Sequence, residues 1–245
     1  MIMNRVKAFF CVIVGLAVFS AAGAFSAHHE QAAASPWKYS LSIESETRDL
    51  NGFLADSKKF ADSGVLAKRG ASMTIYQINA GGHSGANVMT EFYYPNADAM
   101  PSPDVMVASQ AHIDTFGNNP RDDDNVRATF YRNIHFVAPG DPSRYRVFVG
   151  YSVKATNSDY VSQIKEIMSE FATGNEGYGI NEVVAGGLNG ETHLVWWAYD
   201  SQASLMKDLE RTRARYDEVV ARLTATREVL RTVVVTSVLN SATPE

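Results

Sequence analysis

The sequence contains a single cysteine, Cys11, and it lies in the apolar run near the N-terminus. The rest of the chain can form no disulfide and offers no cysteine nucleophile, so the fold must be held by its core alone. The H-E-x-x-H, G-x-S-x-G and phosphate-binding P-loop motifs are absent too. Their absence removes the usual sequence signals for a zinc peptidase, an α/β-hydrolase and a P-loop nucleotide-binding protein.

Long apolar runs are also missing, except at the N-terminus. There two basic residues precede the run AFFCVIVGLAVF, which is followed by small residues. This pattern predicts a cleaved secretory signal peptide over residues 1–24, ending in the A-x-A site of Ala22 and Ala24, with cleavage after Ala27 as the alternative. A membrane anchor is the other interpretation, but the run is short for a span of about 20 residues. We expect a periplasmic or secreted protein that does not bind membranes after cleavage.

Basic residues are too few to suggest an anionic partner. Without Arg5 and Lys7, 20 of the 22 basic residues remain against 27 acidic ones, a net charge near −7. Proteins that bind nucleic acid carry a basic surface, and anionic membranes attract basic segments. The charge balance therefore argues against both kinds of partner.

A glycine-rich turn followed by an apolar strand pattern occurs twice. The stretch AGGHSGANVMTEFYY begins at Ala80, and AGGLNGETHLVWWAY begins at Ala185. Glycines supply the positive-φ freedom that a tight hairpin needs, so both stretches predict a β-hairpin. Over residues 75–94 and 180–199, six of twenty aligned pairs are identical without a gap: Ile75/Ile180, Ala80/Ala185, Gly81/Gly186, Gly82/Gly187, Gly85/Gly190 and Tyr94/Tyr199.

The segments around the two hairpins repeat in the same order, which predicts a β-α-β-β-α-β unit in each half. Alternating residues indicate the strands, and apolar residues at helical spacing indicate the helices. In the first half we expect strands at 38–45, 71–80, 86–94 and 128–137, with helices near 50–61 and 102–117. In the second half we expect strands at 145–153, 177–185, 191–199 and 231–239, with helices at 160–171 and 202–230.

These elements predict an α+β fold of two tandem ferredoxin-like units, residues 37–137 and 144–240, joined by a linker at 138–143. In element order and duplication the chain resembles the dimeric α+β barrel superfamily, in which two such units pack as one barrel. The resemblance covers nearly all of the chain after the signal peptide, rests on no catalytic motif and identifies no specific family. The superfamily includes antibiotic-biosynthesis-type (ABM-like) monooxygenases, haem-degrading enzymes, chlorite dismutases and small isomerases, so the fold does not settle the function.

Strand alternation divides the residues of each hairpin between two faces. We expect the more polar face to line a cavity between the sheets, although a one-residue bulge at the glycines would invert this choice. On that face Glu182 and His193 are diagonal neighbours that can share a proton for general acid–base catalysis, and Tyr199 can contact a substrate oxygen. These three are the predicted catalytic residues. The predicted substrate-binding residues of the same face are Gln77, Thr90, Tyr94 and Trp197.

The resemblance implies an exported barrel that binds a small molecule, with a cofactor-free monooxygenase or isomerase as the best-fitting activity. Two alternatives stay open. One is a non-catalytic binding or interaction protein with a filled barrel, in which Glu182 and His193 form only a satisfied polar pair. The other is a haem protein, because some members ligate iron with a helix histidine and His112 lies on an expected helix. No metal site is predicted, and the substrate and any oligomer stay open.

Overall fold

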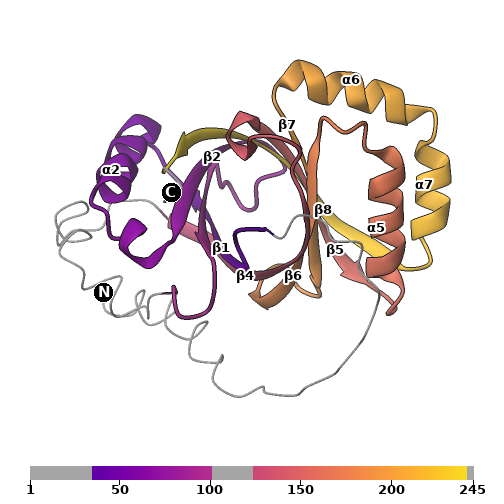
Figure 1. The fold of residues 1–245 in the computed structure, drawn as a ribbon, viewed down its shortest axis with the longest axis horizontal. Coiled ribbons are helices and arrows are strands. Elements are labelled where there is room, and N and C mark those ends of the chain that lie inside the picture. Colours follow the sequence, from indigo (N-terminus) through magenta and orange to yellow (C-terminus); the bar gives the residue numbers. More distant parts are fainter. Residues whose placement is uncertain (1–34, 101–123, 242–245) are drawn as a thin grey trace.

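The computed structural model describes residues 35–100 and 124–241, in which eight antiparallel strands close into a barrel with helices packed on its outside (Figure 1). The strands are β1 (Tyr39–Glu46), β2 (Ser72–Ala80), β3 (Val88–Tyr94), β4 (Asp124–Val137), β5 (Val147–Ala155), β6 (Gly177–Gly186), β7 (His193–Tyr199) and β8 (Arg227–Asn240). The helices are α2 (Leu50–Asp62), α5 (Tyr160–Phe171), α6 (Gln202–Arg213) and α7 (Tyr216–Leu223), with short 3-10 turns η2 (Ala67–Arg69) and η3 (Pro142–Arg144). All eight expected strands are present, with ends no more than four residues from the expected ones.

The two halves have the same strand order, β4-β1-β3-β2 in the first and β8-β5-β7-β6 in the second. Two antiparallel ladders between the halves, β2 with β8 and β4 with β6, close the barrel. Both central hairpins therefore turn at the same end, which we call the glycine end. The other end, where β1 and β5 begin, we call the mouth.

The expected helix over 202–230 is wrong, because this segment forms two helices and the start of a strand. Helix α6 ends at Arg213, α7 runs from Tyr216 to Leu223, and β8 already begins at Arg227. The short α7 packs beside α5, where Arg222 Nη1 lies 2.7 Å from Glu170 Oε2. One straight helix would lose this contact and the burial of Leu223. The helix expected at 102–117 lies outside the described residues.

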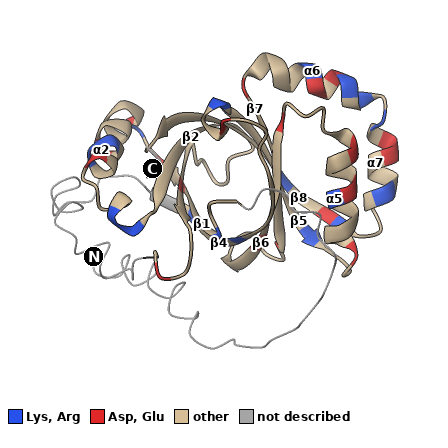
Figure 2. Ribbon diagram, viewed as in Figure 1, with Lys and Arg blue, Asp and Glu red and all other residues tan. Residues whose placement is uncertain are grey.

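The helices cover two opposite sides of the barrel, α2 on the first half and α5, α6 and α7 on the second (Figure 1). Helix α2 places Phe60 against Ile75 and Phe92, and α5 places Ile164 and Met168 against the outside of the second-half strands. Charged side chains gather on the outer helices, while the barrel strands carry few (Figure 2). None of the described helices is long and apolar enough to cross a membrane.

The first glycine of each repeated turn lies against the last strand of the other half. Gly81 and Gly186 have φ angles of +75° and +76°. A Cβ atom would lie 1.9 Å from the carbonyl oxygen of Thr232 in β8 at Gly81, and 2.2 Å from that of Ala128 in β4 at Gly186. Such close backbone approach leaves room only for glycine. The repeated glycines are therefore required at the two seams that close the barrel.

We predict that Gly186→Ala destabilises the protein far more than Gly174→Ala does. Gly174 also has a positive φ, +87°, but nothing lies within 4 Å of its added Cβ, so alanine there costs about 1–2 kcal/mol of backbone strain. At Gly186 the overlap with β4 adds roughly 1–3 kcal/mol. Urea unfolding of both variants measures the difference, and equal losses of unfolding free energy would contradict the close approach.

Candidate functional site

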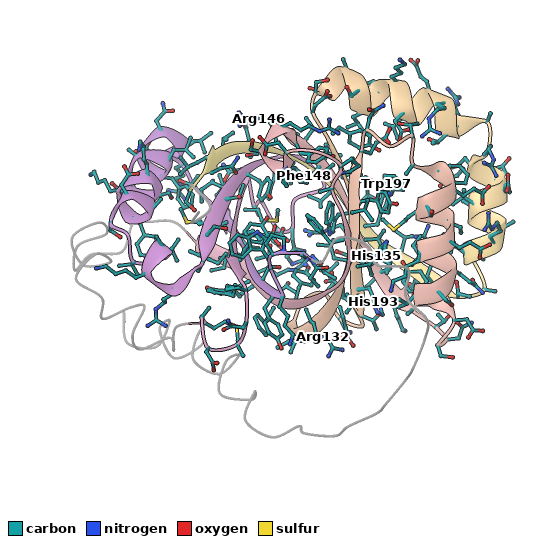
Figure 3. The ribbon with its side chains drawn as sticks, viewed as in Figure 1. Arg132, His135, Arg146, Phe148, His193 and Trp197 are labelled. Atoms are coloured by element: carbon teal, nitrogen blue, oxygen red, sulfur yellow. The ribbon has the colours of Figure 1, made fainter. Side chains whose placement is uncertain are left out.

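A cavity of about 530 Å³, which we call the lumen, lies inside the barrel. Most of its strand residues belong to one alternation set, which includes Glu91 of β3, Phe148 of β5 and Trp196 of β7. The predicted site residues belong to the opposite set and point outward. Figure 3 shows Phe148 inside the barrel, whereas His193 and Trp197 lie between the barrel wall and α5. The expectation that the more polar hairpin face lines the cavity is therefore wrong.

The outer face of the hairpins carries polar residues because the described helices cover only part of it. These polar residues make the outer face resemble a cavity wall in the sequence. Near the glycine end Gln77 is exposed, and Glu182 forms an ion pair with Arg132, which is 51% exposed. Nearer the mouth the same face is apolar, and Phe92 and Tyr94 are buried beneath α2. Polar residues on this face therefore mark the edge of the helix layer and not the cavity.

Strand β1 contains a sequence pattern that identifies which side chains point into the barrel. Leu41 and Ile43 alternate with Ser42 and Glu44, and the apolar pair packs on the outside with the α2 cluster. An amphipathic helix needs an apolar sheet face beneath it, so the polar residues of β1 must point into the barrel. The ladder places Ser42 opposite Glu91 of β3, which extends the inward assignment to that glutamate.

The predicted substrate-binding and orienting residues take part in outer packing. Tyr199 donates a hydrogen bond to Asp208 Oδ2 of α6 at 2.8 Å, and Trp197 packs in the α5 cluster. In the first half Tyr94 is buried beneath α2, and Thr90 is buried on the same outward face. Gln77 is exposed. None of the predicted site residues that the structure describes lines the lumen.

Glu182 and His193 are brought together, but outside the lumen. They lie directly opposite each other and not diagonally, because the hairpin register differs by two residues from the expected one, a shift that leaves the faces unchanged. Glu182 accepts a hydrogen bond from Arg132 Nε at 2.7 Å. The His193 ring lies 5.5 Å from that of Tyr160, and burial lowers its pKa, although the charge of Glu182 opposes this.

The two halves contribute chemically different walls to the lumen. Glu91 of β3 and Trp196 of β7 are 105 residues apart and occupy equivalent places on opposite sides of the eight-stranded ring. Around Glu91 the first-half wall is polar, and around Trp196 the second-half wall is apolar. The polar wall includes Ser40, Ser42, Ser72, Thr74, Tyr76 and Tyr93, and the apolar wall includes Phe148, Gly150, Leu194, Ala198, Val233 and Val235.

Glu91 is the buried acid of the polar wall and begins a chain of hydrogen bonds. It is 9% exposed, and Tyr93 donates to its Oε2 at 2.8 Å. The Tyr76 and Tyr93 hydroxyl oxygens are 2.7 Å apart. Burial raises the pKa of Glu91, and hydrogen bonds from Tyr93 and Ser40 offset this only in part. Burial and the nearby Glu91 also raise the pKa of Tyr93, so its phenol stays protonated.

The apolar wall is built around Trp196, whose ring lies against bare backbone. An added Cβ at Gly179, directly opposite Trp196 on β6, would lie 2.5 Å from the indole Cζ2 atom. The ring centroids of Phe136 and Phe148 lie 5.8 and 6.5 Å from that of Trp196. The absence of a side chain at Gly179 therefore lets the indole ring lie close to β6, and the two phenylalanine rings are tilted by 54–56° to it.

Two arginines and two glutamates form a buried ion cluster at the glycine end of the barrel, where Glu44 and Arg231 line the lumen. Arg231 of β8 donates to both carboxylate oxygens of Glu44 at 2.7 Å. Arg127 Nη1 lies 3.4 Å from Glu44 Oε1, and Arg127 Nη2 lies 3.1 Å from Glu191 Oε2. These side chains are at most 13% exposed. Arg231–Glu44 and Arg127–Glu191 each join the two halves, so the cluster ties them together where the hairpins turn.

The mouth is lined by segments outside the regular strands. They are residues 35–37, the linker at 138–143 and Ser241 after β8. The Trp37 ring lies 6.1 Å from that of Tyr93. Because the buried ion cluster lies at the glycine end, the mouth is the side from which a small molecule can reach Glu91.

A metal ion or haem iron needs suitable ligands among the side chains of the protein. Within the described ranges no three His, Cys, Asp or Glu residues are grouped so as to hold a metal ion. Among these residues, the lumen lining includes no histidine or cysteine to ligate haem iron. His112, the expected haem ligand, lies outside the described residues.

Comparison with known proteins finds similarity at the level of structure alone. A candidate monooxygenase from Fusobacterium nucleatum superposes with a TM-score of 0.57 and 8% identity, covering 84% of this chain and 94% of the other. An anthrone oxidase-like protein gives 0.55 and 13%, covering 86% and 95%. A candidate monooxygenase from Lactobacillus acidophilus gives 0.54 and 10%, covering 84% and 94%. No model of a known protein family matches the chain, and no curated protein matches it.

These similarities show the fold. Each of the three solved structures shares the α+β barrel fold of this chain over at least 84% of its length. In this chain a single polypeptide supplies all eight strands of the barrel.

We predict that Glu91→Gln stabilises the protein relative to the wild type increasingly as the pH rises. A carboxyl with a raised folded pKa binds more protons in the folded than in the unfolded state, so the wild type loses stability as the pH rises from about 4.5 through that folded pKa. Glutamine does not titrate and avoids the loss. Urea unfolding from pH 4 to pH 9 measures the difference, and a gap independent of pH would contradict the raised pKa.

Glu44→Gln should show the opposite trend. Burial alone would raise the pKa of Glu44, but the hydrogen bonds and charge of Arg231, with the charge of Arg127, lower it overall. The stabilisation that the ionised Glu44 carboxylate provides is complete above the pKa of Glu44 in the unfolded chain. It is lost as the pH falls through the lower pKa of Glu44 in the folded protein. We expect a loss of roughly 3–5 kcal/mol near pH 7 that shrinks in acid. The same titration measures it, and a loss that grew in acid would contradict the ion cluster.

Proposed function

We propose that the lumen binds a flat, apolar carbonyl compound and that Glu91 removes a proton from a carbon that the carbonyl activates. The observation that carries this proposal is a buried carboxyl with a raised pKa, in hydrogen-bond contact with Tyr93 on the polar wall of a cavity whose opposite wall is mainly apolar. A general base works best when its pKa lies near the working pH. Burial moves Glu91 in that direction.

The lumen supplies the other requirements of such a reaction. Trp196 and Phe148 form an apolar surface on which a planar molecule can stack while it faces the polar wall. Tyr93 and Tyr76 extend the hydrogen-bond chain from the carboxyl, so a proton taken by Glu91 can be redistributed along it. The site excludes bulk water at the glycine end, which strengthens these interactions.

The resulting carbanion can react in two ways, and both need no cofactor. Returned to a different carbon, the proton gives an isomerase. Attacked by dioxygen, the carbanion gives an oxygenase: anthrone and one O₂ yield anthraquinone and one H₂O, with two C–H bonds lost and one C=O bond formed. The names of the neighbours, candidate monooxygenases and an anthrone oxidase-like protein, agree with the oxygenase branch.

Anthrone oxidation tests this proposal. We expect the purified wild-type chain to form anthraquinone, with kcat/KM rising with pH through the raised pKa of Glu91. Glu91→Gln should lower kcat by at least about 100-fold, because it removes the general base. Tyr93→Phe should lower it less, since the carboxyl remains. Absorbance of anthraquinone and oxygen uptake measure both variants.

The outward carboxylate Glu182 provides the matched control. Glu182→Gln makes the same chemical change outside the lumen and should leave kcat unaltered. Loss of turnover in Glu182→Gln with full activity in Glu91→Gln would place the chemistry between sheet and helices, where Glu182 and His193 lie. Tight anthrone binding without turnover would instead favour the non-catalytic binding protein.

The organisation of the whole chain adds two parts to the proposal. The identical strand order of the halves supports two tandem ferredoxin-like units, each with the order expected of that plan. The N-terminal pattern of basic, apolar and small residues supports export to the periplasm or beyond. The proposed reaction would then act on a molecule met outside the cytoplasm.

A further inference from the structure

Three buried polar atoms at the glycine end have no hydrogen-bond partner within the described residues. They are Arg231 Nε, Arg127 Nη1 and Ser152 Oγ. Ser152 faces Arg231 across the ladder between β5 and β8, and Arg127 and Arg231 both lie beside Glu44. Each of these groups can donate a hydrogen bond, so the end of the lumen presents donors without an acceptor.

The duplication explains why these donors are left over. Glu44 lies opposite Met89 in the first half, and Ser152 lies opposite Leu194, the residue 105 positions later. Ser152 therefore occupies the place in the second half that Glu44 occupies in the first. The short serine side chain supplies no carboxylate beside Arg231, so the Nε–H of Arg231 has no acceptor from this strand.

The geometry of Arg231 determines which of its edges is free. Glu44 accepts from both terminal nitrogens, which is an end-on pairing of guanidinium and carboxylate. This arrangement leaves the Nε–H on the side edge without an acceptor. Arg231 is among the residues that line the lumen, whereas Arg127 and Ser152 are not, so Arg231 is the donor nearest to a bound molecule.

Charge balance decides what kind of acceptor fits. The cluster holds two guanidinium groups, of Arg127 and Arg231, and two carboxylates, of Glu44 and Glu191, so it is already neutral. A further buried carboxylate would bring an uncompensated negative charge, which is costly in a site of low polarity. A neutral carbonyl oxygen accepts the free hydrogen bonds without that cost.

We infer that the glycine end of the lumen is a subsite for a neutral carbonyl oxygen, held by Arg231 Nε. This subsite rests on the proposed function and adds an orientation to it, with the carbonyl directed inward and the apolar body along Trp196. It selects ketones and quinones over hydrocarbons, which leave the donors unpaired, and over carboxylates, which unbalance the charge.

Calorimetric binding of three probes of similar shape tests the subsite: methyl naphthyl ketone, ethylnaphthalene and naphthoate at pH 8. We expect the wild type to bind the ketone about 10-fold or more tightly than the hydrocarbon, and naphthoate more weakly than the ketone. Arg231→Lys keeps the positive charge but removes the Nε edge, and should reduce the ketone preference to within about twofold while hydrocarbon binding persists. Ser152→Ala, which leaves the ion pairs intact and removes a donor that does not line the lumen, should retain the ketone preference.

Arg132→Lys is the matched control, because it makes the same change on the outside of the barrel and should retain the full ketone preference. Equal binding of ketone and hydrocarbon by the wild type would overturn the subsite alone, since water then satisfies the donors. Tighter binding of naphthoate would also overturn it, in favour of an anion site. Failure of all three probes to bind would remove the proposed function together with the subsite.

Discussion

Closure of the barrel is the constraint on which the rest of this structure depends. The ladders of β2 with β8 and of β4 with β6 leave no free sheet edge, so every strand must direct alternate side chains into one shared lumen. Closure also brings backbone of one half against the hairpin turn of the other, which only glycine permits at residues 81 and 186. The same junction buries Arg127 and Arg231, each in an ion pair with a carboxylate of the opposite half.

Within that closed frame the duplicated halves have diverged in chemistry while keeping their topology. One half presents Glu91 and its hydroxyl neighbours, and the other presents Trp196 on a glycine strand. A symmetric lumen would face acid with acid or ring with ring, and would hold an asymmetric molecule in two equivalent orientations. The difference between the walls gives a bound molecule one preferred orientation. The ion cluster is asymmetric too. Arg127 and Arg231 occupy equivalent places in the two halves, but Glu44 of the first half is matched by Ser152 in the second.

Much of this architecture could be predicted from local patterns, but the site could not. The strands and the hairpins follow from alternation and from glycine, because both depend on neighbouring residues in the chain. The face of each hairpin that lines the lumen depends instead on where the helices end above it. Gln77 and Glu182 look like cavity residues in the sequence because they are polar, yet they lie on an outer part of the barrel that none of the described helices covers. Only β1, where Leu41 and Ile43 must meet α2, contains enough local information to show the inward face.

By itself the sequence determined the duplicated order of elements, the turns and the α+β class, since each arises from interactions over a few residues. The tertiary structure decided which glutamate is buried in the lumen, which tryptophan faces it, and how four charges from β1, β4, β8 and the second hairpin turn meet at one end. These features join residues as far apart as Glu44 and Arg231. Their energies depend on burial and on partners that only the closed barrel brings together.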